Sequence, residues 1–146
     1  MTLTHLVEHG RLIYTGPTPT NVLEAFNISL NKWYTLAVLE DYRDFKACGG
    51  FDTCGLCMLY HHTLSCVECP IRLDAENTTK GHNCYANTYF QAFYDELDSG
   101  DPPDPEVLRD LARQEYLFIL GLARKTLPKD YFPNLLEQVT PLEQAP

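Results

Sequence analysis

Apolar residues recur every three to four positions along two long stretches of the chain, which predicts a mainly α-helical fold. In the stretch 21–46, the positions that share one helical face are Leu23, Phe26, Leu30, Trp33 and Ala37, flanked by Tyr34, Val38, Tyr42 and Phe45. In the stretch from Asp104 to Leu127, they are Leu108, Leu111, Phe118 and Leu122. We expect both helices to bury these faces in a single core, with Trp33 as a core anchor.

Residues that favour helix ends flank both stretches. Asn21 is followed three residues later by Glu24, an arrangement that resembles a capping box. Asp104-Pro105-Glu106 places an N-cap acceptor, a proline at the first helical position and an acidic residue in the first turn. We expect the first helix to stop before Gly49-Gly50 and the later one to end near Leu127, after Arg124-Lys125.

The remaining segments are shorter. Residues 1–16 hold two apolar runs broken at His9-Gly10, which predicts a small β-hairpin. A second helix is expected from about Asn87 through Leu97, so that 87–127 forms a helical pair. The segment 128–146 is proline-rich and is expected to lie along the surface or hang free. With 146 residues, the chain is expected to form one small helical domain.

The chain is acidic, with a net charge of −9. Nucleic-acid backbones are bound by Lys and Arg, so direct nucleic-acid binding is disfavoured, and a basic protein surface is the expected partner. Between Asp95 and Asp110, seven carboxylates face Arg109 alone, a local balance of 1 − 7 = −6. The candidate partner-binding residues are Asp95, Glu96, Asp98 and Asp101. The alternative is a solvated loop with carboxylates that favour helix ends.

The first residues carry neither a basic n-region nor a long apolar h-region, and the longest apolar run is too short to span a bilayer. We therefore expect a cytoplasmic protein without membrane contact, whose thiols stay reduced. A disulfide staple is disfavoured for this reason.

Five of the six cysteines are spaced like a metal site. They follow the pattern Cys54-x2-Cys57-x8-Cys66-x2-Cys69-x14-Cys84 within the segment 48–86. Each C-x-x-C turn brings two thiolates to one side, and two such pairs complete a tetrahedral shell for structural Zn²⁺. Four of the five are expected to bind: Cys54, Cys57 and Cys69, with Cys66 and Cys84 as alternatives for the fourth position. Cys48 is expected to be a small buried residue.

Other chemistries fit this segment less well. A thioredoxin-type reaction at Cys54–Cys57 needs a βαβ setting that the pattern does not predict. A zinc deaminase needs an H-x-E motif, which the chain lacks. An iron–sulfur cluster is an alternative, but the spacings match neither ferredoxin run. Among the histidines, His82 is the better alternative ligand, and His61 is expected to be an exposed helix residue.

The order of these motifs resembles a pattern in small proteins of uncharacterised function that bacteriophages and prophages encode. The matching residues are Trp33, Cys54-Gly55-Leu56-Cys57, Cys66-Val67-Glu68-Cys69-Pro70, Gly81, Cys84 and Thr88-Tyr89. The group usually carries a proline between the Thr and the Tyr, and this chain does not. The resemblance implies an accessory protein that acts in the cytoplasm of a phage host, and it implies no activity.

Two functions of different classes follow. The first is a non-enzymatic, zinc-stapled helical protein that binds a host or defence protein and modulates or inhibits it. The second is a small-molecule-binding or thiol-redox protein that uses the cysteine cluster or an aromatic pocket built from the nine Tyr and seven Phe. No constellation typical of a catalytic site is found in the sequence.

Overall fold

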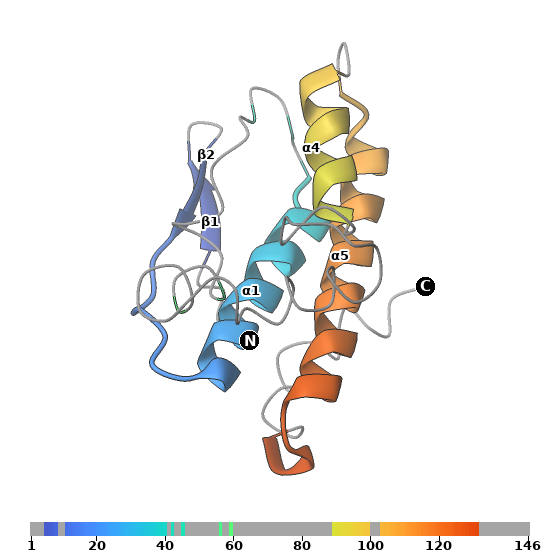
Figure 1. Cartoon of the computed structure of the whole chain (residues 1–146). Coiled ribbons are helices and arrows are strands. Elements are labelled where there is room, and N and C mark those ends of the chain that lie inside the picture. Colours follow the sequence, from blue (N-terminus) through green and yellow to red (C-terminus); the bar gives the residue numbers. More distant parts are fainter. Residues whose placement is uncertain are drawn as a thin grey trace.

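The computed structural model describes residues 5–8, 11–40, 42, 45, 56, 59, 89–99 and 103–131. This part is mainly helical and carries a short antiparallel hairpin, as the sequence predicts (Figure 1). Its elements are strands β1 (His5–Glu8) and β2 (Arg11–Tyr14), helices α1 (Val22–Ala37), α4 (Tyr89–Ser99) and α5 (Pro105–Thr126), and the 3-10 turn η3 (Lys129–Tyr131).

The hairpin pairs His5 with Tyr14 and Glu8 with Arg11 across its two strands. Leu12 enters the core, and the rings of His5 and Tyr14 lie 5.1 Å apart between centroids. The Tyr14 hydroxyl then donates a hydrogen bond to the carbonyl of Pro17. Gly16 lies so close to this ring that a Cβ there would be 2.5 Å from the Tyr14 hydroxyl oxygen. The chain that follows β2 therefore packs closely against the side chain of Tyr14, the last residue of that strand.

Helix α1 begins where the sequence predicts. The Asn21 side chain accepts a hydrogen bond from the Glu24 amide at 2.9 Å, which makes Asn21 the N-cap. The Glu24 carboxylate reaches back one residue further than in a standard capping box and accepts from the Thr20 hydroxyl at 3.0 Å. The side chains of Asn21 and Glu24 thus stabilise the first turn of α1.

The prediction that this helix extends to residue 46 is wrong, because α1 ends at Ala37. Tyr42 and Phe45 lie outside the helix but are buried in the same core. Their apolar side chains therefore continue the helical spacing in the sequence beyond the residue at which the helix ends. The Tyr42 hydroxyl donates back to the carbonyl of Leu36. Burial raises the pKa of the Tyr42 phenol, and the positive charge of Arg109 opposes this rise. Tyr42 therefore stays a donor to the helix end.

Helix α5 matches its prediction at both ends. The Asp104 side chain accepts from the Glu106 amide at 2.9 Å, Pro105 occupies the first turn, and Leu127 is the C-cap. Helix α4, Tyr89–Ser99, starts within two residues of the predicted position.

Helix α1 lies between the hairpin and α5, and α4 packs beside the N-terminal half of α5 (Figure 1). The helices α1 and α5 run antiparallel, because Tyr116 of α5 packs against Tyr34 while Arg109 reaches the residues after the C-terminal end of α1. Trp33 meets Phe93 of α4 edge to face, 5.4 Å apart between ring centroids. Trp33 is buried, so its predicted role as a core anchor is confirmed.

Candidate functional site

All six cysteines, including the predicted ligands Cys54, Cys57, Cys66, Cys69 and Cys84, lie outside the described residues. His61, His82, Asp101 and the tail beyond residue 131 also lie outside them. In the part that is described, no three His, Cys, Asp or Glu side chains are grouped so that they could hold a metal ion. The zinc site therefore stays a prediction from the sequence.

Two residues of the cysteine-rich segment are described, and both belong to the core. Leu56 and Leu59 have helical backbone conformation and buried side chains, three positions apart and so on one side of a helix. The backbone N–H of Leu56 donates to Ser29 Oγ of α1 at 3.2 Å. This bond joins Leu56, which stands between Cys54 and Cys57 in the sequence, to α1.

The helix that receives this segment is buried around most of its circumference. Ten of its residues are buried, including the polar Ser29, Asn31, Lys32 and Thr35. The side chain of Lys32 is 0% exposed, and its Nζ lies 5.2 Å from the centroid of the Trp33 ring. On α5, Glu115 is 1% exposed. The periodicity of α1 assigns Lys32 outside its apolar face, whereas Glu115 lies on the apolar face of α5, four residues after Leu111 and three before Phe118.

Three predicted partner-binding residues lie in the second half of α4. The side chains of Asp95 and Asp98 are exposed and that of Glu96 is half-buried. Asp104, Glu106 and Asp110 are exposed on the first turns of α5, beside them in the same helical hairpin (Figure 1). These six carboxylates are called the acidic end below.

The two halves of the acidic end differ in their relation to helix dipoles. On α5, Asp104 and Glu106 stand at the positive N-terminus, where carboxylates stabilise a helix. On α4, the carboxylates stand near the negative C-terminus, and its last turn contains no basic residue. The explanation by helix-end preference therefore holds for α5 and fails for α4.

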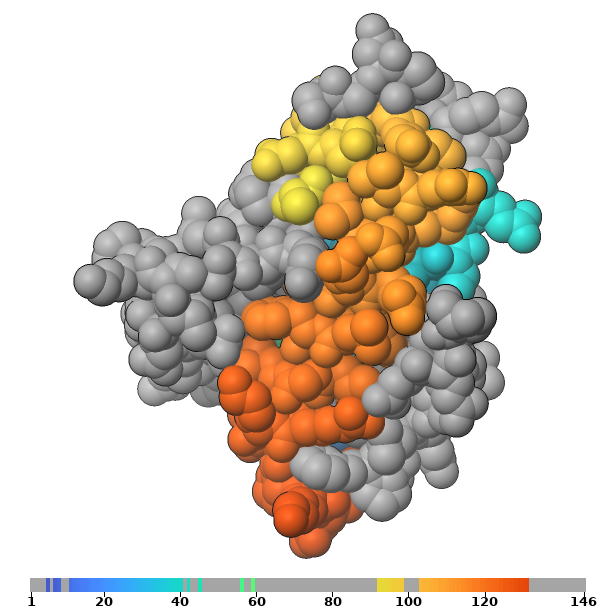
Figure 2. All heavy atoms as spheres, turned by 90° about the vertical axis from the view of Figure 1, so that its right-hand side faces the viewer, coloured from blue at the N-terminus to red at the C-terminus, as the bar shows by residue number. Residues whose placement is uncertain are grey.

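Arg109 is the basic residue within the acidic stretch Asp95–Asp110, and its side chain points toward the residues that follow α1. Its Nη1 donates to the carbonyl oxygens of Leu39 and Glu40 at 3.0 and 3.2 Å. Figure 2 shows residues after α1, in cyan, next to the upper half of α5. The guanidinium therefore caps the chain that leaves α1 and is turned toward these carbonyls.

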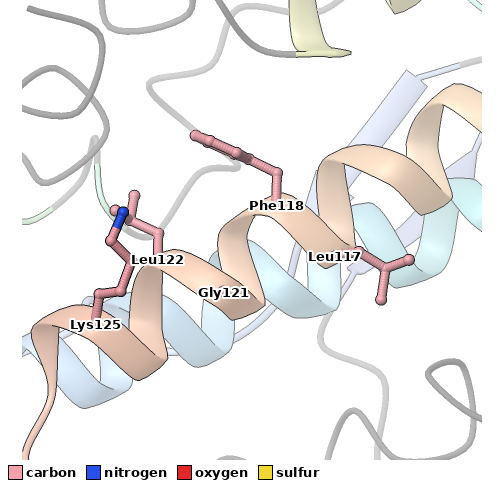
Figure 3. Close-up of a pocket in the computed structure, with 5 residues that line it drawn as sticks. All are labelled: Leu117, Phe118, Gly121, Leu122 and Lys125. Atoms are coloured by element: carbon pink, nitrogen blue, oxygen red, sulfur yellow. The ribbon is translucent and has the colours of Figure 1, made fainter. Parts of the chain in front are cut away.

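A shallow depression of about 260 Å³ lies on α5, far along the helix from the acidic end. It is lined by Leu117, Phe118, Gly121, Leu122 and Lys125, of which Phe118, Leu122 and Lys125 project from one side of the helix (Figure 3). A Cβ on Gly121 would meet nothing within 4 Å, so the missing side chain helps to open this surface. The depression is smaller than a typical ligand pocket and lacks a convergent set of polar groups.

An aromatic pocket is one alternative suggested by the sequence. In the described part of the chain, several aromatic side chains pack on one another. Phe93 contacts Trp33, Tyr42 and Tyr94, with ring centroids 5.4 to 6.2 Å apart and near-perpendicular or tilted planes. These are the distances and angles of a packed aromatic core. The rings named here stabilise the junction of α1 and α4.

Among the helices of the described part, none combines the length and the apolar character needed to cross a membrane. The chain matches no protein-family model, no curated protein and no solved structure.

Proposed function

We propose that this chain is a non-enzymatic, zinc-binding accessory protein that binds a basic surface of another protein through its acidic end. The zinc is structural, held by four of Cys54, Cys57, Cys66, Cys69 and Cys84. The resemblance to phage-encoded proteins favours a host or defence protein as the partner, whose activity the binding alters.

The observation that carries this proposal is the position of Glu96 and Asp98 in the last turn of α4. A carboxylate near a helix C-terminus is disfavoured by about 0.3–1 kcal/mol at an exposed position. Helix stability alone therefore does not account for Glu96 and Asp98 in the last turn of α4, which contains no base. A role in binding a cationic partner accounts for them.

The charge balance of this surface supports the same partner. Arg109 is bound to carbonyls after α1, and the whole chain carries a net charge of −9. The negative electrostatic potential of this surface attracts basic surfaces over about one Debye length, roughly 8 Å at physiological salt, and speeds association.

The structural zinc is supported by the thiolate spacing and by the attachment of Leu56. The stretch Asp74–Asn83 contains Ala75 as its single apolar residue, so packing alone supplies little folding energy there. A four-thiolate zinc site supplies that energy and is closed to water, which fits a structural role.

Charge reversal tests the partner surface. Tagged protein is used to capture partners from lysate of the native host at low and at physiological salt, with Asp98→Lys as the test variant. The matched control is Asp130→Lys, an exposed reversal on η3 at the other end of α5. We expect Asp98→Lys to lose a basic protein that wild type and Asp130→Lys both retain. Equal capture by all three contradicts the proposed surface.

Metal analysis tests the zinc site separately. Purified protein is expected to contain about one zinc per chain, and Cys57→Ser or Cys69→Ser to lose it, while Cys48→Ser keeps it. Thiol titration with and without a chelator separates this role from a thiol-redox one. A closed site protects its thiols until the metal is removed, whereas a redox pair reacts without chelator.

A further inference from the structure

One side of α5 carries opposite charges at its two ends. The side chains of Glu106 and Asp110 are exposed near the N-terminal end, and those of Arg124 and Lys125 are exposed in the last turn. At about 100° per residue, all four lie within a sector of about 100° around the helix axis, opposite the buried Leu108. These four charges cancel, in a chain whose net charge is −9.

Between its charged ends, the same side of α5 is apolar. Leu117 and Phe118 are half-buried there, and Gly121 is exposed beside them. These three residues line the depression of about 260 Å³ (Figure 3). Figure 2 shows α5, in orange, uncovered over most of its length. The depression therefore lies in an open helix face with charges of opposite sign at its two ends.

The fold does not require a glycine at position 121. Gly121 lies within α5, and a Cβ there would meet nothing within 4 Å. Glycine inside a helix lowers stability relative to alanine, and its use is to let another group approach the backbone closely. The glycine is therefore explained by a surface that approaches α5 from outside this fold.

A second copy of the same face complements the first. The midpoint between Asp110 and Lys125 falls between Leu117 and Phe118. When two α5 helices lie antiparallel about that midpoint, Asp110 of each copy lies opposite Lys125 of the other, and the apolar residues meet at the twofold axis. Side chains lean toward the N-terminus of their own helix, so Leu117 of the second copy leans over Gly121 of the first.

We propose that this face of α5 is a homodimer interface, in which two chains pack their α5 helices antiparallel about a twofold axis between Leu117 and Phe118. The apolar middle of the second copy fills the depression. A single helix face buries less area than a permanent dimer needs, so the dimer is weak and depends on concentration. The proposed partner surface rests on Glu96 and Asp98 of α4, so dimerisation and partner binding use different helices.

Charge reversal and mixing test the arrangement. Sedimentation velocity over a concentration series measures the dimer for wild type, for Asp110→Lys and for Lys125→Asp. Each single reversal places like charges at two symmetric contacts, and we expect the dissociation constant of the dimer to rise about tenfold. An equal mixture of the two variants should form a heterodimer as stable as the wild-type dimer, because every contact again pairs opposite charges.

The recovery in the mixture identifies a contact between chains. Asp110 and Lys125 are 15 positions apart, about 22 Å along one helix, so a contact within one chain does not produce it. Asp98→Lys, which reverses a carboxylate on α4, is the matched control and should leave the dimer unchanged.

Gly121→Gln tests the apolar middle. Gln favours a helix more than Gly does, and its Cβ has room, so the Tm of dilute protein should stay the same or rise. We expect the dimer to be lost at concentrations at which wild type forms it, because the added side chain separates the two helices.

Three results overturn the inference. Wild-type protein that sediments as a monomer at every concentration shows that no second copy occupies this face. A dimer that is equally stable in wild type, Asp110→Lys and Gly121→Gln assigns the association to another surface. Loss of the dimer in both reversals without recovery in the mixture excludes the antiparallel arrangement.

Discussion

The guanidinium of Arg109 lies 3.0 Å from the carbonyl oxygen of Leu39, to which it donates a hydrogen bond. This contact joins residues 70 positions apart in the chain and ties the start of α5 to the chain that leaves α1. A second bond from the same nitrogen reaches Glu40. The acidic stretch therefore contains a base whose main role in the fold is to hold α1 and α5 together.

Replacement of Arg109 should destabilise the fold. Arg109→Gln removes charge-assisted hydrogen bonds to two carbonyls, and we expect a loss of about 1.5–3 kcal/mol in the free energy of unfolding by urea. Arg124→Gln, an exposed change in the last turn of α5, is the control. It should cost about 0.3–1 kcal/mol, the amount expected of a base at a helix C-terminus. Equal losses would mean that the Arg109 bonds contribute little.

Stability should fall at alkaline pH because of Tyr42. Burial raises the pKa of its phenol above the ordinary value of 10.0. Below pH 10 the phenol is protonated in both folded and unfolded chains, and its hydrogen bond to Leu36 contributes in full. As pH rises from 10 toward the folded pKa, only the unfolded chain loses the proton, so stability falls by up to about 1.4 kcal/mol per pH unit.

Tyr42→Phe removes this titration. We expect the variant to be less stable than wild type at pH 8 by about 0.5–1.5 kcal/mol, the usual contribution of one hydrogen bond. The difference should narrow in urea titrations between pH 10 and pH 11. Tyr131→Phe, at an exposed position on η3, controls for the loss of one phenol. A constant difference between wild type and Tyr42→Phe contradicts the shifted pKa.

The helix starts of this fold could be predicted because their signals are local. Asn21 and Asp104 accept hydrogen bonds from backbone amides two or three residues away, and such spacings are visible in the sequence. The end of α1 could not be predicted in the same way. Tyr42 and Phe45 continue the apolar spacing because they pack in the same core after the helix has ended, and periodicity does not distinguish the two cases.

The burial of Lys32 could not be predicted for a different reason. Its position relative to Trp33 and Leu36 assigns it to the edge of an amphipathic face. It is buried because α1 is enclosed on more than one side, in part by Leu56, which is distant in the chain. Contacts between residues so far apart in the sequence leave no periodic pattern in it. The spacing of the cysteines, in contrast, predicts a metal site directly from the chain.

The bond between Ser29 and Leu56 should stabilise the attachment of the cysteine-rich segment. Ser29→Ala leaves the Leu56 N–H buried without its acceptor, and we expect a cost of about 1–3 kcal/mol in the free energy of unfolding, with faster thiol labelling. Thr35→Val is the matched control, because the Thr35 hydroxyl donates to Asn31 O within the same helix. That carbonyl keeps its helical bond, so the change should cost less than about 1 kcal/mol and leave thiol labelling unchanged. Faster labelling in both variants would assign the effect to α1 as a whole.

Asp98 and Asp104 should have opposite effects on stability although both belong to the acidic end. Asp104 caps α5, so Asp104→Ala should cost about 0.5–2 kcal/mol. Asp98 lies next to the last residue of α4, where a positive charge is favoured, so Asp98→Lys should raise stability by about 0.3–1 kcal/mol. Urea unfolding of the two variants measures both signs. A gain in stability together with a loss of the captured partner means that Asp98 serves binding at the expense of the helix. If Asp98→Lys instead destabilises the protein as much as Asp104→Ala does, then Asp98 serves the fold, and the argument for a partner surface on α4 no longer holds.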